Sequence, residues 1–76
     1  MTVTVHMHGN LRRFMERGVD RARLDVAEAA TVEDVLVLLG AEKDTWLVAV
    51  NNVAVERDTV LKLDDDVDCF EPVAAG

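Results

Sequence analysis

The feature that most constrains the fold is a single strong helix signal at residues 31–40 of a 76-residue chain. Thr31 and Asp34 are spaced as a capping box, in which a hydroxyl and an acid three residues later each satisfy a free backbone amide. Apolar residues then recur at helical spacing at Val32, Val35, Leu36 and Leu39. Gly40 follows as a helix stop. Because one amphipathic helix cannot bury its apolar stripe alone, we expect it to pack on a sheet.

The rest of the chain supplies the strands of that sheet. Residues 2–8 alternate strictly between apolar and polar, which is typical of a half-buried strand. Further strands are predicted at residues 23–26, 46–50, 53–55 and 67–70. The order strand, strand, helix, strand, short strand, strand predicts an α+β fold. We expect a mixed four- to five-stranded sheet with one main helix packed on one face.

Local signals add detail to this plan. A short helix is predicted after the first strand, capped by Asn10 and stopped by Gly18. Its apolar side would hold Leu11, Phe14 and Met15. Asn51 and Asn52 tolerate positive φ and predict a turn. Trp46 begins an apolar strand and is expected to pack in the core.

The charge and cysteine content exclude several classes of function. The net charge of −7 argues against nucleic acid and anionic membranes as partners and favours a partner with a basic face. The one cysteine, Cys69, allows neither an intrachain disulfide nor a cysteine-built metal site. Alternation places Cys69 in the core as a small hydrophobe. No signal-peptide pattern or membrane-length apolar run is visible, so the cytoplasm is the expected location.

The end of the sequence is unusual in its small side chains. Phe70 and Glu71 are followed by Pro72 and then by Val73, Ala74, Ala75 and Gly76. Four residues after Pro72, fully extended, can span roughly 13 Å. A thin tail ending in glycine is suited to carry a bare carboxylate into another protein's active site. We therefore expect a domain over residues 1–72 and a flexible tail over residues 73–76.

In this order and spacing, the pieces resemble the ThiS/MoaD family of ubiquitin-like β-grasp sulfur carrier proteins. The segments that carry the resemblance are Leu11-Arg12, Thr31-Val32, Val50-Asn51-Asn52, Leu61 through Val67, and Phe70 through Gly76. The resemblance covers nearly the whole chain and implies a β-grasp fold. It also implies a carrier that is itself a protein substrate, not an enzyme, or the small subunit of a synthase.

The chemistry implied by the resemblance centres on Gly76. An adenylyltransferase of the ubiquitin-activating type would use ATP to adenylate the Gly76 carboxylate, and a persulfide or sulfide would then produce a thiocarboxylate. A synthase subunit would accept the tail and take the sulfur, and the carrier would bind no cofactor. Val73, Ala74 and Ala75 would thread through the partner's tunnel, and Phe70 and Pro72 would contribute to docking. The tail and the helix after the first strand favour the molybdopterin or tungstopterin type over the thiamin type.

Two positions depart from the family pattern. The family usually ends in Gly-Gly, whereas the penultimate residue here is Ala75, whose methyl group adds bulk and removes positive-φ conformations. An enzyme tuned to Gly-Gly is expected to process this tail slowly. Asp65 stands where the family often has glycine in an Asp-Gly-Asp turn, and Asp tolerates the left-handed region at a small cost.

Other features leave alternatives open. His6 and His8 share one strand face, but the sequence shows no third metal ligand, so ordinary exposed histidines are expected. The acidic run 64–68 lacks the glycine and glutamate of a calcium loop. Phe70 points away from the core, either to dock a partner or to cover the sheet. The arginines in 12–23 are expected to be solvated, although they could bind phosphate or acidic groups.

Two other functions also fit the sequence. The chain could be a non-covalent ubiquitin-like binding module, with an incidental C-terminus. It could also be a ubiquitin-like modifier that is conjugated to proteins through Gly76.

Overall fold

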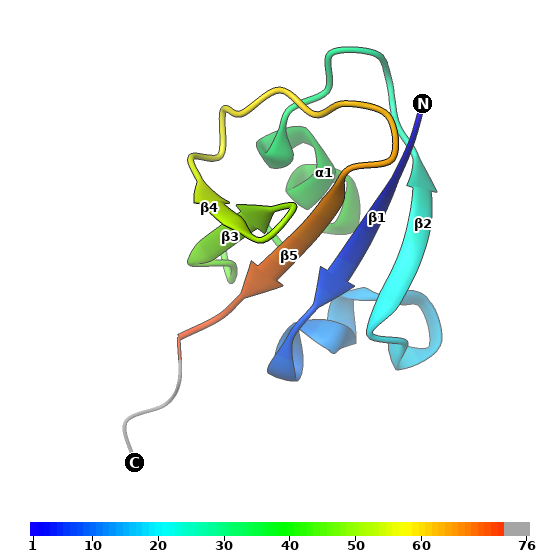
Figure 1. Ribbon diagram of the computed structural model, residues 1–76. Helices are drawn as coiled ribbons and strands as arrows, with labels where there is room; N and C mark the ends of the chain where they lie inside the picture. Colours follow the sequence, from blue (N-terminus) through cyan, green and yellow to red (C-terminus); the bar gives the residue numbers. More distant parts are fainter. Residues whose placement is uncertain (73–76) are drawn as a thin grey trace.

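Within residues 1–72, five strands form one mixed sheet, and a single α-helix lies across one of its faces (Figure 1). The strands are β1 (Thr2–Met7), β2 (Arg21–Asp25), β3 (Leu47–Val50), β4 (Val53–Val55) and β5 (Asp66–Phe70), and the helix is α1 (Val32–Leu39). This computed structural model describes residues 1–72. The predictions for Val73, Ala74, Ala75 and Gly76 lie outside the described residues.

The sheet is assembled around a parallel pair of strands. Its order is β2-β1-β5-β3-β4, so β1 and β5, far apart in the sequence, are neighbours at the centre (Figure 1). They pair in parallel from Thr4–Asp66 to Met7–Cys69. On one side of this pair, β2 runs antiparallel to β1. On the other side, β3 runs antiparallel to β5, and β4 runs antiparallel to β3 at the edge of the sheet. The predicted mixed sheet with one main helix is therefore confirmed, with five strands.

The core lies between the sheet and α1. The inward positions of β1 and β5 are completely buried, namely Val3, Val5, Met7, Val67 and Cys69. They meet Val32, Val35 and Leu36 of the helix, which are also buried. The predicted alternation of β1 is thus confirmed, as is the core position of Cys69.

The ends of α1 match the local signals in the sequence. The Thr31 hydroxyl accepts a hydrogen bond from the Asp34 amide at 3.2 Å. The Asp34 carboxylate accepts one from the Thr31 amide at 2.9 Å, which completes the capping box. Gly40 ends the helix with φ of +76°.

The segment after β1 differs from the predicted short helix. It forms two 3₁₀ helices, η1 (Gly9–Phe14) and η2 (Glu16–Gly18). The N-cap is His8, without a side-chain cap, so the prediction that Asn10 caps this helix was wrong. Asn10 lies inside the first turn because Gly9, with φ of +60°, already bends the chain out of β1.

The structure confirms the predicted turn at Asn51 and Asn52, but in the acidic turn it gives the left-handed conformation to a different residue than expected. Asn51 and Asn52 adopt φ of +51° and +70°, as expected for the β3–β4 turn. In the acidic turn the left-handed residue is Asp64, with φ of +66°, and not Asp65. The Asp65 side chain instead faces inward, where it accepts hydrogen bonds from Asn51 Nδ2 at 2.9 Å and from the Lys62 amide at 2.7 Å. The acid at this position therefore joins two turns.

Trp46 is the clearest error of the sequence-based prediction. Its side chain is 75% exposed, and it precedes β3 instead of lying within the core. Helix α1 covers only one face of the sheet, so β3 buries Val48 but leaves Leu47 exposed. A run of apolar residues suggested burial on both faces, and only one face is covered. Among residues 1–72, no helix has the length and apolarity needed to cross a membrane.

Candidate functional site

The chain leaves the sheet at a point that is held from both sides. Phe70 is the last residue of β5, and its carbonyl oxygen accepts a hydrogen bond from the Trp46 amide at 2.9 Å. On the other side, the His8 amide donates to the Cys69 carbonyl oxygen at 3.0 Å. Backbone contacts to the start of β3 and the end of β1 thus define where the C-terminal segment departs.

The next residue, Glu71, is held by polar contacts to η1. Its Oε1 accepts a hydrogen bond from the Asn10 amide at 2.9 Å, and its Oε2 lies 3.4 Å from Arg13 Nη1. Arg13 also donates to the Asn10 carbonyl oxygen at 2.6 Å, and its Nη2 lies 3.4 Å from the Asp44 carboxylate. A Cβ at Gly9 would lie 3.5 Å from Glu71 Oε1, which is an ordinary van der Waals contact, so glycine is favoured at this position by its φ of +60° and not by lack of space. The path of the chain is therefore fixed through residue 71.

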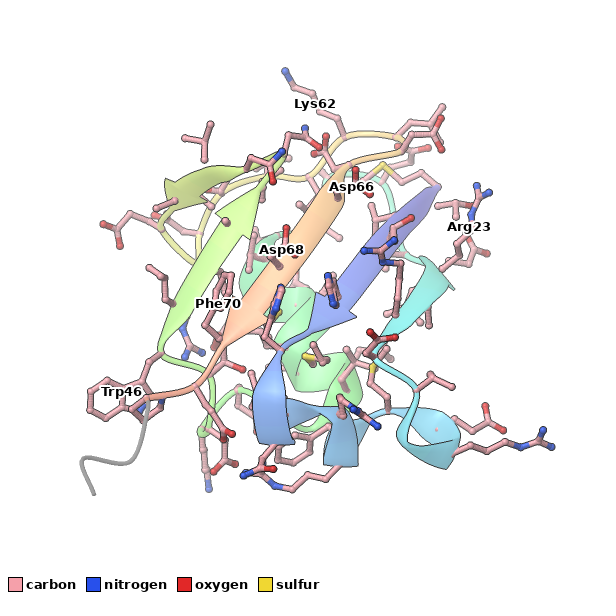
Figure 2. The ribbon with its side chains drawn as sticks, turned by 60° about the horizontal axis from the view of Figure 1, so that its bottom comes forward. Arg23, Trp46, Lys62, Asp66, Asp68 and Phe70 are labelled. Atoms are coloured by element: carbon pink, nitrogen blue, oxygen red, sulfur yellow. The ribbon has the colours of Figure 1, made fainter. Side chains whose placement is uncertain are left out.

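An apolar patch lies beside this exit, formed by strand residues on the sheet face opposite α1 together with Trp46, which precedes β3. Phe70 pairs with Leu47 across β5 and β3, and Leu47 and Trp46 are 52% and 75% exposed. Ala49 and Ala54 pair next to them on the same face. Figure 2 shows Phe70 and Trp46 close to the point where the C-terminal segment departs. We call Trp46, Leu47, Ala49, Ala54 and Phe70 the exit patch.

The same face turns polar toward β1 and β2. The Phe70 ring stacks on His8, with ring centroids 4.2 Å apart and planes 13° apart. His8 Nε2 lies 2.8 Å from Asp68 Oδ1, and His6 Nδ1 lies 3.3 Å from the same oxygen. The sequence alone shows no third potential ligand beside the two histidines, and the structure places Asp68 there. The parallel register of β1 and β5 sets His6 directly opposite Asp68.

The cysteine next to this face is not reactive. Burial, together with the charge of Asp68, raises the pKa of the Cys69 thiol to about 12, while Arg57 lowers it to a smaller extent. The side chain is completely buried on the helix side of the sheet. At neutral pH it is a protonated core residue, and it offers neither a nucleophile nor a metal ligand.

The structure brings together some of the predicted site residues and adds others. Phe70 lies on the exit patch and Pro72 is exposed just beyond it, whereas the predicted threading residues and Gly76 lie outside the described residues. The sequence reasoning missed Leu47 and Glu71. Only the cross-strand pairing with Phe70 reveals Leu47, and only the fold brings Glu71 to η1.

A mixed β2-β1-β5-β3-β4 sheet with one helix across it, and the C-terminal segment leaving from a central strand, defines a ubiquitin-like β-grasp domain. The ThiS family model matches residues 5–76. The chain therefore belongs to the ThiS family of small sulfur carriers.

Solved structures agree with this fold. SAMP1 from Haloferax volcanii superposes with a TM-score of 0.80 at 23% identity, covering 100% of both chains. The putative molybdopterin converting factor subunit 1 from Pyrococcus furiosus gives 0.77 at 26% identity, covering 96% of this chain and 99% of that one. Another structure of the H. volcanii small archaeal modifier protein 1 gives 0.77 at 24% identity, covering 95% and 98%. The comparison with curated proteins gave no match.

Proposed function

We propose that this chain carries sulfur as a thiocarboxylate on Gly76. The observation that carries the proposal is the fixed exit at Phe70 and Glu71, which is held by β1, β3 and η1. Only small residues and one valine follow Pro72. A rigid exit followed by a thin segment would let a carboxylate reach up to roughly 13 Å from the docking surface. We accordingly treat residues 1–72 as the folded domain and residues 73–76 as a flexible tail.

The proposed reaction has two steps, adenylation of the carboxylate and transfer of sulfur to it. The Gly76 carboxylate attacks the α-phosphorus of ATP, which gives an acyl adenylate and releases pyrophosphate. Sulfide then attacks the acyl carbon and expels AMP, leaving the thiocarboxylate. If a persulfide attacks instead, a thiol must reduce the resulting acyl disulfide to release the thiocarboxylate. In this proposal the partner enzymes supply the catalytic groups, and the buried Cys69 thiol, whose pKa is raised to about 12, takes no part.

The exit patch is the proposed docking surface for these enzymes. It combines the exposed side chains of Trp46 and Leu47 next to the departure point, and tryptophan is among the residues that most often contribute strongly to binding at interfaces. Phe70 and Pro72 would lie at its edge nearest the tail, and Val73, Ala74 and Ala75 would thread into the active site. The expected partners are a ubiquitin-activating-type adenylyltransferase and a synthase subunit that accepts the sulfur, both in the cytoplasm.

Within the family, the molybdopterin or tungstopterin type is the proposed pathway. Its support is the Phe-x-Pro-Val tail and the similarity at 26% identity to the putative molybdopterin converting factor subunit from P. furiosus. Thiamin synthesis remains the alternative within sulfur transfer. Assays with purified synthase subunits of both pathways distinguish the two, because only the cognate subunit should remove the sulfur.

An intact-mass experiment tests the proposal. The tag-free chain is incubated with the adenylyltransferase encoded by the same organism, ATP and sulfide, and we expect one oxygen to be replaced by sulfur. Deletion of Gly76 should abolish the change, and Ala75→Gly should speed it, whereas Ala74→Gly serves as the matched control. Adducts linked through Gly76 to lysines would show a protein modifier instead. An unchanged mass with every adenylyltransferase of that organism would refute activation at Gly76.

A second experiment tests the docking surface. Leu47→Ala removes an exposed side chain of the exit patch, and Leu38→Ala removes one of similar exposure from α1. We expect Leu47→Ala to raise the KM of the adenylyltransferase for the carrier and Leu38→Ala to leave it unchanged. Equal effects of the two variants would show that the enzyme does not dock on the exit patch.

A further inference from the structure

The open face of the sheet holds a cluster of metal-binding side chains that sulfur transfer does not use. His6 and His8 come from β1 and Asp68 from β5, and their candidate ligand atoms all lie within 4.8 Å of one another. The cluster exists because neighbouring side chains on one strand face are two residues apart and because β5 lies beside β1 in register. Figure 2 shows Asp68 on the sheet face opposite α1, between Asp66 and Phe70.

We propose that His6, His8 and Asp68 bind one divalent transition-metal ion of the zinc type. Two imidazoles and a carboxylate are donors that suit zinc, cobalt, nickel and copper better than magnesium or calcium. With bonds of about 2.0–2.2 Å and tetrahedral angles, donor atoms on one zinc ion lie about 3.3–3.6 Å apart. Asp68 Oδ1 lies 3.3 Å from His6 Nδ1, which matches that spacing. It lies 2.8 Å from His8 Nε2, which is a hydrogen-bond distance that must lengthen by about 0.5 Å when the metal replaces the proton.

The second nitrogen of His6 supports this arrangement. If Nδ1 binds the metal, Nε2 carries the proton, and Nε2 lies 3.6 Å from the carboxylate of Asp20. Metal-binding histidines commonly donate their other N–H to a carboxylate, which fixes the ring and the tautomer. Asp20 lies just beyond hydrogen-bond distance of this nitrogen, so a small side-chain rotation would make it such a partner without making it a ligand.

The burial of the cluster is intermediate, which suits a site that exchanges metal with solvent. The side chains of His6, His8 and Asp68 are 24%, 34% and 19% exposed. His8 stacks on Phe70 and contacts the tilted ring of His6, with centroids 3.9 Å apart and planes 34° apart, and these contacts limit the rotation of both imidazoles. Three protein donors leave at least one coordination position open, where water or an exogenous ligand binds.

One neighbour opposes metal binding. Arg21 Nη2 lies 3.4 Å from His6 Nδ1 and competes for the same lone pair. A bound metal therefore requires the guanidinium to move aside. Arg21 is exposed on β2, so this movement meets no packed side chains.

Zinc titration of the tag-free full chain tests the proposal. We expect saturable binding of one Zn²⁺ per chain by calorimetry, with Asp68→Asn and His8→Gln each weakening it by about tenfold or more. Asp66→Asn is the matched control, because it removes the same charge from the same strand face two residues away. Absence of 1:1 binding, or an equal loss with Asp66→Asn, would overturn the assignment. Circular dichroism verifies that each variant is folded.

Two further measurements locate the ion. Paramagnetic Co²⁺ should broaden the amide signals of His6, His8 and Asp68 before those of the acidic turn at residues 64–66, and the reverse order would contradict the site. Arg21→Gln should tighten zinc binding several-fold more than Arg23→Gln, which removes the same charge two residues along β2. Neither measurement depends on sulfur transfer, so failure of one proposal leaves the other standing.

Discussion

Replacing Asp65 tests whether a buried acid joins two turns of the fold. The Asp65 side chain is almost completely buried, and its carboxylate accepts hydrogen bonds from Asn51 Nδ2 and the Lys62 amide. Asn51 belongs to the β3–β4 turn and Lys62 precedes the acidic turn, so the carboxylate links segments from two parts of the chain. Asp65→Ala removes both contacts and leaves both donors without this partner.

The magnitude follows from the two hydrogen bonds. A bond to a charged acceptor contributes about 1.5–3 kcal/mol, and the lower part of this range applies because Asn51 and Lys62 are exposed and can reach water. We therefore expect Asp65→Ala to cost about 2–3 kcal/mol, out of the roughly 4–11 kcal/mol of a chain this size. The corresponding fall in Tm is about 10–20 °C.

Urea unfolding followed by circular dichroism measures the loss. The matched control is Asp66→Ala, whose side chain is exposed, and its expected change is within about 0.5 kcal/mol. A double-mutant cycle with Asn51→Gly, which keeps the positive φ available, should give a coupling of about 1 kcal/mol. If Asp65→Ala costs no more than Asp66→Ala, the carboxylate does not join the turns and the reasoning fails.

Two more predictions concern the core. Leu36→Ala should lower the free energy of unfolding by about 3 kcal/mol, because this side chain is completely buried against the sheet. Leu38→Ala, at a side chain that is 63% exposed on the same helix, should change it little. Urea unfolding measures both values, and similar costs would contradict the assigned helix face. Since burial raises the pKa of Cys69 from 9.0 to about 12, iodoacetamide at pH 8 should label it only after unfolding in urea, and rapid labelling of the native protein would refute its burial. The folded state keeps this proton where the unfolded state loses it, so stability should fall as pH rises from 9 toward 12.

The parts of the fold that could be predicted from the sequence are those determined by neighbouring residues. The capping box at Thr31 and the alternation of β1 depend on contacts within a few positions, so their patterns can be read directly. Trp46 was misplaced because it precedes β3 and lies outside the paired strands, and no local pattern shows where the covered part of the sheet ends. Asp65 was misread because its inward orientation depends on Asn51, which lies 14 positions away.

The same reasoning applies to the candidate sites. The composition of the tail pointed to Gly76 because its chemistry belongs to consecutive residues. The cluster of His6, His8 and Asp68 was not recognised because the pairing of β1 with β5 brings together residues about 60 positions apart. Likewise, the link from Glu71 to η1 requires the first and last strands to be adjacent.

The parallel pairing of β1 and β5 also has a mechanical consequence. A pull between the N-terminal end of β1 and the C-terminal end of β5 acts along both strands in opposite directions. The hydrogen bonds from Thr4–Asp66 to Met7–Cys69 are then loaded together in shear, whereas pulling a hairpin apart from its open end breaks its bonds one at a time. A partner that pulls on the C-terminal segment while holding the N-terminus would therefore meet the strongest resistance this sheet can offer.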